Sequence, residues 1–355
     1  MKIVTILGAR PQFIKASSLS REIAKRNEIE EIIIHTGQHF DVNMSAIFFK
    51  EMEIPEPKYN LEINSLSHGA MTGRMLEEIE KILLLERPDW TVVYGDTNST
   101  IAGALASKKL HMKVAHVEAG LRSYEMRMPE EINRILTDQI SDILFCPTQI
   151  AVDNLRSEGF ENKDSKIYMS GDIMYDSALH YKTKMKRPIG LVNESSYILV
   201  TIHRQENTDD SQRLKNIIET LNRLASDGEN FLWPMHPRTK KIIEASGIPV
   251  KFNCIEPVGY LEMLYLIDNC SSIITDSGGL QKEAYFFNKF CITLRDSTEW
   301  VELVDNNVNK LMNVDDSTLY ENIKSHLDNK VDSSLNLYGK GNAAEIIVNE
   351  LINNS

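Results

Sequence analysis

Short apolar runs and amphipathic segments alternate along nearly the whole chain. Short runs with β-branched residues, such as residues 2–7, 90–96 and 143–148, predict strands, and several are almost continuously apolar. Continuous apolar runs are typical of parallel strands that are covered on both faces. Between the runs, apolar residues recur at helical spacing, for example over 98–110 and 214–226. The alternation predicts an α/β fold of doubly wound, Rossmann-like parallel sheets.

The helix predicted from residue 129 onward has an unusual polar side. Its apolar stripe predicts ordinary packing and consists of Ile132, Ile135, Leu136, Ile140 and Ile143. Pro129 fits the first helical position, Glu130 and Glu131 lie at the positive end of the helix dipole, and Arg134 follows one turn later. Ion pairing within a well-capped helix explains this pattern, and a functional role explains it equally well.

The regular signals lapse over residues 174–196, where polar residues, Pro188 and Gly190 gather. We therefore expect two doubly wound domains, over 1–173 and 174–340. The tail 341–355 contains a further predicted helix, which we expect to cross back to the first domain.

Composition narrows the class of protein. At 355 residues, with 42% hydrophobic and 25% charged residues, the chain is typical of a soluble protein with two ordinary domains. A net charge of −12 argues against a broad nucleic-acid or anionic-membrane surface, although a local phosphate pocket is still allowed. No apolar run approaches the roughly 18 residues that cross a bilayer. We expect a cytoplasmic enzyme or binding protein.

The cysteines predict neither disulfides nor a metal site. Cys146, Cys254, Cys270 and Cys291 form no C-x-x-C pair, and most lie in apolar, strand-like contexts. No histidine, acidic or cysteine spacing of a known metal motif is present. We expect reduced core cysteines and no metal.

Titratable residues gather where the predicted strands end. In open α/β sheets, ligands bind outside the carboxyl ends of the strands. Asp96 and Glu118 follow two strands of the first half, and His203 and His236 follow two strands of the second half. Two histidines at equivalent positions favour function over a structural role. We expect the site in the crevice between the two sheets.

The first strand end resembles an anion-binding turn. Gly8 allows close approach of the backbone, a helix begins directly afterwards, and Arg10 and Lys15 supply positive charge. A plain strand-to-helix turn explains the same residues.

A stronger phosphate pattern stands at 276–279. Ser277, Gly278 and Gly279 enter a helix and would leave backbone N–H groups free for a phosphate, and Glu283 could bind a ribose.

Three carboxylates come from successive elements at one sheet edge. Asp96, Glu118 and Glu130 are interspersed with arginines at 122, 127 and 134. Carboxylates in different environments serve acid and base roles. A structural ion-pair network is the alternative.

Taken together, these motifs resemble those of the non-hydrolysing UDP-N-acetylglucosamine 2-epimerase family. The matching segments are GARPQFIK, YGDTNST, HVEAGLRS, MPEEINR, HRQEN, TDSGG-x-Q-x-E and RDSTEWVE, spread in this order over nearly the whole chain. The resemblance implies a glycosyltransferase-B-like fold with the active site in the interdomain cleft, and a homodimer. It implies an isomerase that inverts C2 of a UDP-2-acetamido sugar, converting UDP-GlcNAc to UDP-ManNAc for surface polysaccharides, with no cofactor.

The resemblance also implies roles for individual residues. Loss of UDP would give an enzyme-held glycal, and UDP would then add back. The catalytic residues implied are Asp96, Glu118, Glu130 and His203. The substrate- or UDP-binding residues implied are Arg10, Lys15, Arg134, His236, Ser277, Gly278, Gly279 and Glu283.

The sequence departs from the usual family pattern at several positions. HRQEN replaces H-R-R-E-N, and TEWVE at 298–302 replaces T-E-R-P-E. The TEWVE form is similar to epimerases that act on UDP-2,3-diacetamido-2,3-dideoxy-glucuronate, whose carboxylate would favour an extra cation such as Arg127 or Arg238. Gln38 and His39 match an effector-binding loop of some members, but the following residues differ, which leaves activation by a second UDP-GlcNAc open.

Three other functions remain open. A glycosyltransferase of the same fold would not explain the carboxylate cluster. A hydrolysing 2-epimerase would differ only in whether water reaches the glycal first. A nucleotide-sugar sensor would bind UDP without needing the three carboxylates together.

Overall fold

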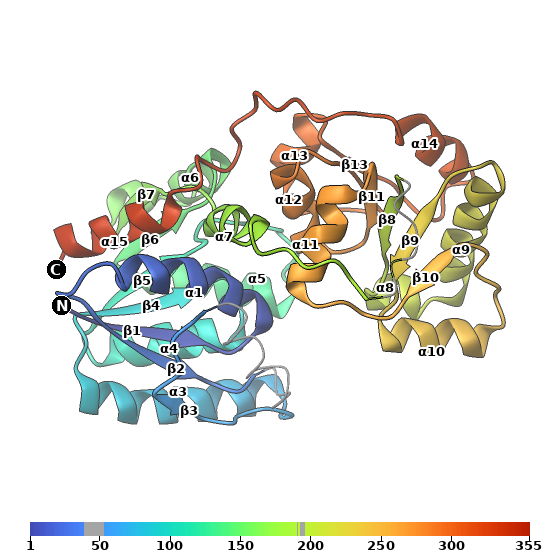
Figure 1. The fold of residues 1–355 in the computed structure, drawn as a ribbon. Helices are drawn as coiled ribbons and strands as arrows, with labels where there is room; N and C mark the ends of the chain where they lie inside the picture. Colours follow the sequence, from blue (N-terminus) through green and yellow to red (C-terminus); the bar gives the residue numbers. More distant parts are fainter. Residues whose placement is uncertain (39–52, 190, 192–195) are drawn as a thin grey trace. The chain divides into compact units, whose positions relative to one another are not determined.

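The chain forms two compact units in the computed structural model, which describes residues 1–38, 53–189, 191 and 196–355 (Figure 1). The N-terminal unit comprises Met1–Ser177 and Tyr338–Ser355, and the C-terminal unit comprises Ala178–Leu337. The sequence had placed the boundaries at 173/174 and 340/341. It had also predicted no regular structure from residue 174, which is wrong, because a helix spans Ile173–Lys182.

The N-terminal unit is built on a seven-stranded, fully parallel sheet. Its strands are β1 (Lys2–Leu7), β2 (Glu30–His35), β3 (Tyr59–Asn60), β4 (Trp90–Tyr94), β5 (Lys113–Val117), β6 (Ile143–Cys146) and β7 (Lys166–Met169), in the order β3-β2-β1-β4-β5-β6-β7. The helices are α1 (Arg10–Ile23), α3 (His68–Glu86), α4 (Asn98–Lys109), α5 (Pro129–Ile140), α6 (Gln149–Ser157) and α15 (Ala343–Asn353), with a 3₁₀ turn, η1, at Phe160–Asn162. Helix α7 (Ile173–Lys182) begins in this unit and ends in the next, because the boundary falls between Ser177 and Ala178.

Apolar strands of this sheet are buried because helices cover both faces. One core cluster joins Val4, Ile34 and Val93 of the sheet to Met75 and Ile79 of α3. On the opposite face α1 packs against α15 (Figure 1). The tail therefore belongs to the N-terminal unit, where the indole Nε1 of buried Trp90 donates to the carbonyl of Leu351 at 3.0 Å.

The C-terminal unit repeats the design on a six-stranded parallel sheet. Its strands are β8 (Ile198–Thr201), β9 (Phe231–Pro234), β10 (Asn253–Ile255), β11 (Ser272–Thr275), β12 (Phe290–Thr293) and β13 (Asn309–Leu311), in the order β10-β9-β8-β11-β12-β13. The helices are α8 (Gln205–Thr208), α9 (Ser211–Ser226), α10 (Pro237–Ser246), α11 (Tyr260–Asn269), α12 (Gly278–Phe286), α13 (Val301–Asp305) and α14 (Leu319–His326).

The predicted α/β fold of two doubly wound parallel sheets is confirmed. In the N-terminal sheet the winding direction reverses between β1 and β4, and in the C-terminal sheet between β8 and β11. At such a reversal the connections leave in opposite directions and open a crevice at the carboxyl ends of the two strands. The fold therefore marks the turns after β1, β4, β8 and β11 as the places for a ligand.

Candidate active site

In the N-terminal unit, the turns after β1, β4 and β5 bring a cation and a carboxylate into contact. Lys15 lies on α1, which follows β1, and Glu118 follows β5. The Lys15 Nζ lies 2.5 Å from the Glu118 Oε1, and the two side chains are only 9% and 10% exposed. A Cβ atom built on Gly95, which follows β4, would lie 3.3 Å from that Nζ. Two predicted site residues thus meet beside the crevice.

The backbone at this edge adopts a conformation that is rare for a residue with a side chain. Glu118 has φ +73°, and the glycines at 95 and 120 have φ +61° and +79°. The left-handed region costs a non-glycine residue roughly 1–2 kcal/mol and is found disproportionately at functional sites. The bend turns the Glu118 carboxylate away from the strand direction and toward Lys15.

A second cation–carboxylate pair lies at the same edge. Asp96, directly after β4, forms an ion pair with Arg134 of α5. Arg134 also donates to Glu131 at 2.9 Å, and the Asn133 amide donates to the backbone carbonyl of Asp96 at 2.9 Å. Helix α5 therefore fixes both the side chain and the backbone of Asp96.

The buried side of α5 is polar, contrary to the sequence prediction. Its buried residues are Glu131, Arg134, Thr137 and Asp138. Ile132 and Leu136, which the sequence assigned to an ordinarily packed stripe, are 41% and 49% exposed. The helix also ends at Ile140, and Ile143 opens β6. The periodicity was read correctly, but α5 turns its polar face toward the strand ends.

The two glutamates that open α5 differ sharply in environment. Glu131 is fully buried and accepts hydrogen bonds from Ser123 N, Ser123 Oγ, Tyr124 N and Arg134. Glu130 is exposed. Glu131 thus holds the loop before the helix in place, whereas the predicted catalytic Glu130 reaches solvent.

The anion-binding turn predicted after β1 is not available in the predicted form. The N–H groups of Gly8 and Ala9 both donate to the Gln12 Oε1, at 2.8 and 3.0 Å. A Cβ atom on Gly8 would lie 2.0 Å from the Ser99 Oγ and 2.2 Å from the Thr36 Oγ1. Gly8 therefore serves close packing, and its amide is already satisfied.

The predicted effector loop is only partly described. The Gln38 Oε1 accepts from the Ser99 Oγ at 2.9 Å and from the Ser99 N at 3.1 Å, so Gln38 is tied to the start of α4. His39 and the side chain of Arg10 lie outside the described residues.

In the C-terminal unit, one buried aspartate joins the two turns of the crevice. Asp276, fully buried after β11, accepts from the backbone N–H groups of His203 and Arg204 at 3.0–3.1 Å and from the Asn207 amide at 3.3 Å. These bonds fix the turn after β8 and leave the His203 side chain 47% exposed.

The predicted phosphate turn begins helix α12, as expected. A Cβ atom on Gly279 would meet nothing within 4 Å, so the space beside that residue is open. A Cβ atom on Gly278 would lie 2.4 Å from the Glu299 Oε1. The Arg295 Nη1 lies 3.1 Å from the Glu299 Oε2, and the positive charges of Arg295 and Arg204 outweigh burial and lower the pKa of Glu299. The protein's own carboxylate lies against the start of this helix.

Other side chains of the TEWVE segment pack on α12. The Trp300 Nε1 donates to the carbonyl of Gly278 at 3.0 Å, and the Thr298 hydroxyl donates to Gln281 at 2.7 Å. The Lys282 Nζ lies 4.0 Å from the centroid of the Trp300 ring. Glu283 is buried on the same helix. The tryptophan that departs from the usual family pattern thus supports the phosphate turn.

His203 and His236 are electrostatically coupled. Burial, the charge of His203 and that of Arg238 lower the pKa of His236. The His236 Nδ1 accepts from the backbone N–H of Arg238 at 3.2 Å, which leaves Nε2 to carry the proton of the neutral ring.

Arg127 and Arg238, the two candidate cations for binding a substrate carboxylate, already form ion pairs with acidic side chains. Arg238 pairs with Asp209. Arg127 is 89% exposed and pairs with Glu125 at 2.7 Å. A substrate carboxylate would have to compete with these groups.

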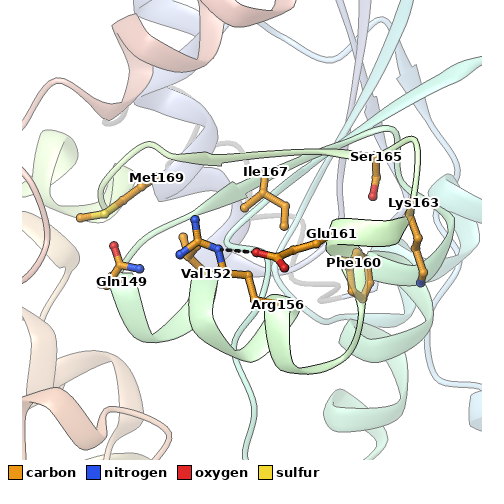
Figure 2. A pocket seen from close by; sticks show the side chains of 9 residues that line it. All are labelled: Gln149, Val152, Arg156, Phe160, Glu161, Lys163, Ser165, Ile167 and Met169. Carbon is orange, nitrogen blue, oxygen red and sulfur yellow. Dashed lines mark ion pairs between the residues drawn. The ribbon is translucent and has the colours of Figure 1, made fainter.

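A cavity of about 320 Å³ lies away from these turns, between α6, η1 and β7 (Figure 2). The Arg156–Glu161 ion pair crosses it, at 3.4 Å. None of the nine labelled lining residues is a predicted site residue.

Over residues 1–38, 53–189, 191 and 196–355, no cluster of three or more His, Cys, Asp or Glu side chains could hold a metal ion. Among the helices described over the same residues, none is long and apolar enough to cross a membrane.

Comparison with known proteins decides the family. The sequence profile described as UDP-N-acetylglucosamine 2-epimerase matches residues 21–352. The chain belongs to the UDP-N-acetylglucosamine 2-epimerase family. It is therefore an isomerase, as the resemblance implied. It is 54% identical, over 99% of both chains, to the UDP-2,3-diacetamido-2,3-dideoxy-D-glucuronate 2-epimerase of Pseudomonas aeruginosa.

Solved structures agree with this family and fold. The crystal structure of the Methanocaldococcus jannaschii UDP-GlcNAc 2-epimerase in complex with UDP-GlcNAc and UDP is 44% identical and has a TM-score of 0.86, with 99% of this chain and 100% of that chain covered. A glycosyltransferase of kitacinnamycin, 9% identical with a TM-score of 0.58 over 99% and 95% of the two chains, shares the fold alone. The glycosyltransferase-B-like fold is confirmed.

Within this epimerase, sequence reasoning missed several buried polar residues beside the carboxylates. Gln12 donates to the Tyr94 carbonyl at 2.8 Å and so ties the turn after β1 to the end of β4. His116 is the fourth of the five residues of β5, and Asp138 lies one turn after Arg134. A histidine inside an otherwise apolar strand was the signal available, because a buried imidazole needs partners.

Proposed function

We propose that this epimerase inverts C2 of UDP-2,3-diacetamido-2,3-dideoxy-D-glucuronate. The observation that carries the proposal is the 54% identity, over 99% of both chains, with the Pseudomonas aeruginosa enzyme named for that substrate. The TEWVE segment, which packs on the phosphate turn through Trp300, points to the same branch of the family.

The chemistry requires loss and return of UDP, because a carbon bearing an amide and no adjacent carbonyl is a poor carbon acid. A base removes the proton from C2, and the electron pair of the C2–H bond forms a C1=C2 double bond. At the same time the C1–O bond breaks and its electron pair leaves with UDP, so the sugar becomes a glycal. UDP oxygen then attacks C1 while C2 takes a proton on the opposite face. Each turnover thus needs one base and one acid, on the two faces of the sugar.

The two cation–carboxylate pairs of the N-terminal unit support this chemistry. An ammonium in contact with a carboxylate favours its ionised form, which a general base requires, and Lys15 contacts Glu118 in this way. We assign the proton transfers at C2, and stabilisation of positive charge at C1, to Asp96, Glu118 and Glu130. Which of them acts on which face is left open by the proposal.

The diphosphate and nucleoside would bind mainly through the C-terminal unit. The open space beside Gly279 at the start of α12 supports phosphate binding there. We assign phosphate contacts to Ser277 and Gly278 as well, the ribose to Glu283, and the diphosphate to His203 and His236. From the N-terminal unit we assign Arg10, Lys15 and Arg134 to the departing diphosphate.

UDP-GlcNAc is the second candidate substrate. The observation in its favour is the 44% identity with the Methanocaldococcus jannaschii enzyme, whose structure holds UDP-GlcNAc and UDP. A substrate without the C6 carboxylate would also need no cation beyond those already paired.

Proton NMR in deuterated water distinguishes these functions. We expect deuterium at C2 and a new manno-configured UDP-sugar with the diacetamido-glucuronate substrate, at a higher kcat/KM than with UDP-GlcNAc. The reverse preference would favour the second candidate. Free sugar plus UDP would indicate hydrolysis, and no exchange with either compound would overturn epimerisation.

Variants then test the assigned residues. Asp96→Asn and Glu118→Gln should each lower kcat by about 10²-fold or more while UDP affinity stays within a few-fold. Glu161→Gln, which alters an exposed carboxylate 67% accessible to solvent, is the matched control and should keep full activity. Full activity in both site variants would remove the assigned roles.

We further propose a cytoplasmic homodimer that needs no metal and supplies a surface-polysaccharide precursor. Exposed apolar side chains support self-association: Leu84 and Leu85 on α3 are 54% and 72% exposed, and Ile132 and Leu136 on α5 are 41% and 49% exposed. Sedimentation velocity should give about twice the 40.5 kDa chain mass, and EDTA should leave activity unchanged. A monomer at working concentration would refute the dimer.

A further inference from the structure

Three charged or polar side chains form a buried cluster beneath the strand ends of the N-terminal unit. His116 and Asp138 are fully buried, and Arg122 is 6% exposed. The His116 Nδ1 lies 2.7 Å from the Asp138 Oδ1, and the Arg122 Nη1 lies 2.7 Å from the Asp138 Oδ2. Arg122 is held in turn by Glu158 at 2.6 and 2.7 Å. Burying this many charges costs free energy unless each one is paired, as it is here.

Both ring nitrogens of His116 face acceptors. Nδ1 faces the Asp138 carboxylate, and Nε2 lies 2.7 Å from the backbone carbonyl of Gly95. Burial favours a neutral Asp138, but the hydrogen bond from His116 and the charges of His116 and Arg122 outweigh burial and lower the pKa of that carboxyl. A carbonyl oxygen can only accept, so the Nε2–H of His116 donates to Gly95, and the ring bridges that carbonyl and the Asp138 carboxylate.

The cluster forms hydrogen bonds to the backbone close to Asp96 and close to Glu118. His116 binds the carbonyl of Gly95, the residue before Asp96. Asp138 accepts from the N–H of Gly120 at 3.1 Å, two residues after Glu118. Both of these glycines and Glu118 have positive φ. A strained backbone conformation persists only where several surrounding contacts hold it in place. The bonds from His116 and Asp138 are such contacts.

We propose that His116 and Asp138 are positioning residues that hold Asp96 and Glu118 in place for proton transfer at C2. The inference rests on the proposed epimerisation and deepens it. Neither side chain reaches the crevice, since both are fully buried, so their effect acts through the backbone. A displacement of about 1 Å at a reacting group can cost about 10²-fold in rate.

The test compares two replacements of Asp138. Asp138→Asn can keep every bond: its oxygen would accept from Gly120 and Arg122, and its NH₂ would donate to a neutral His116 whose Nε2–H still serves Gly95. Asp138→Ala removes the hydrogen bonds to Gly120, His116 and Arg122. We expect Asp138→Ala to lower kcat by about 10- to 100-fold with KM within about threefold, and Asp138→Asn to recover kcat to within about threefold of wild type.

A product ratio separates positioning from general loss of structure. A glycal formed while the second carboxylate is out of place returns to UDP-sugar slowly, and more of it leaves the enzyme. The ratio of released glycal to epimer, measured by proton NMR, should therefore rise several-fold in Asp138→Ala and stay near wild type in Asp138→Asn. This ratio does not depend on the fraction of enzyme that is folded.

Thr137→Ala is the matched control, because Thr137 is fully buried on the same helix and its hydroxyl has no hydrogen-bond partner among the described residues. It should lower stability and leave the product ratio unchanged. His116→Gln, which keeps one of the two bonds, covers the case in which Asp138→Ala does not fold. An unchanged kcat and ratio in the folded variant would overturn the inference. Absence of epimerisation in wild type would instead overturn the proposed function.

Discussion

Glu130 and Glu131, adjacent at the start of α5, test whether burial distinguishes a structural glutamate from one that takes part in proton transfer. Glu131 is fully buried and its two oxygens accept from Ser123, Tyr124 and Arg134 at 2.8–3.1 Å. In Glu131→Gln, an NH₂ in place of Oε1 would face the Tyr124 N–H, and in place of Oε2 it would face Arg134. Each orientation sets a donor against a donor.

The cost of Glu131→Gln follows from these contacts. Removing one member of a buried ion pair costs about 3–5 kcal/mol, and the retained amide oxygen keeps part of the hydrogen bonding. We therefore expect a loss of about 3 kcal/mol, local to the 121–128 loop and the first turn of α5. Since each 1.4 kcal/mol is tenfold, amide exchange at Ser123 and Tyr124 should accelerate by about 10²-fold.

Hydrogen exchange followed by mass spectrometry measures that acceleration on peptides covering residues 121–128. Glu130→Gln is the matched control: this residue is exposed, so its exchange rates should change by less than about twofold, although turnover should fall if Glu130 transfers a proton. Equal protection in Glu131→Gln and wild type, or equal acceleration in both variants, would refute the distinction between the two glutamates.

Three further predictions concern stability and reactivity. Gly8→Ala should destabilise the protein by roughly 1–3 kcal/mol in urea unfolding, because its Cβ would lie 2.0 Å from the Ser99 Oγ. Burial raises the pKa of Asp176 to about 6, so the folded state binds this proton more tightly than the unfolded state and stability should fall by up to about 3 kcal/mol as pH rises from about 4 to about 6. Asp176→Asn should flatten that slope, and an unchanged slope would contradict the assignment. Native protein should show one thiol reactive toward a maleimide, that of Cys254, since the other three cysteines are buried, and all four should react after unfolding.

The strands and their parallel pairing were predictable because a sheet covered on both faces needs continuous apolar runs. The run IVTIL of β1, for example, is completely buried. The chemistry at the strand ends was predictable for the same reason: topology alone places Asp96 and Glu118 at one edge.

The orientation of α5 was not predictable from its periodicity. A stripe of Ile and Leu at helical spacing shows that the helix has two faces, but it does not show which face meets the sheet. Here the polar face lies inward because Arg134 and Asp138 find charged partners at the strand ends. The sequence left the role of Gly8 open between anion binding and a plain turn, because its neighbours Ser99 and Thr36 come from elements distant in sequence.

The N-terminal unit also has a consequence for the order of events during synthesis. Residues 178–337, which form the other unit, are made before the segment from Tyr338 onward that completes the first sheet's cover. Until that segment leaves the ribosome, the face of α1 that receives α15 and the indole N–H of Trp90 that binds Leu351 lack their partners. The unit whose synthesis begins first is thus completed last. A nascent chain stalled after residue 337 would expose the α1 surface that α15 covers, and chaperones can recognise such a surface.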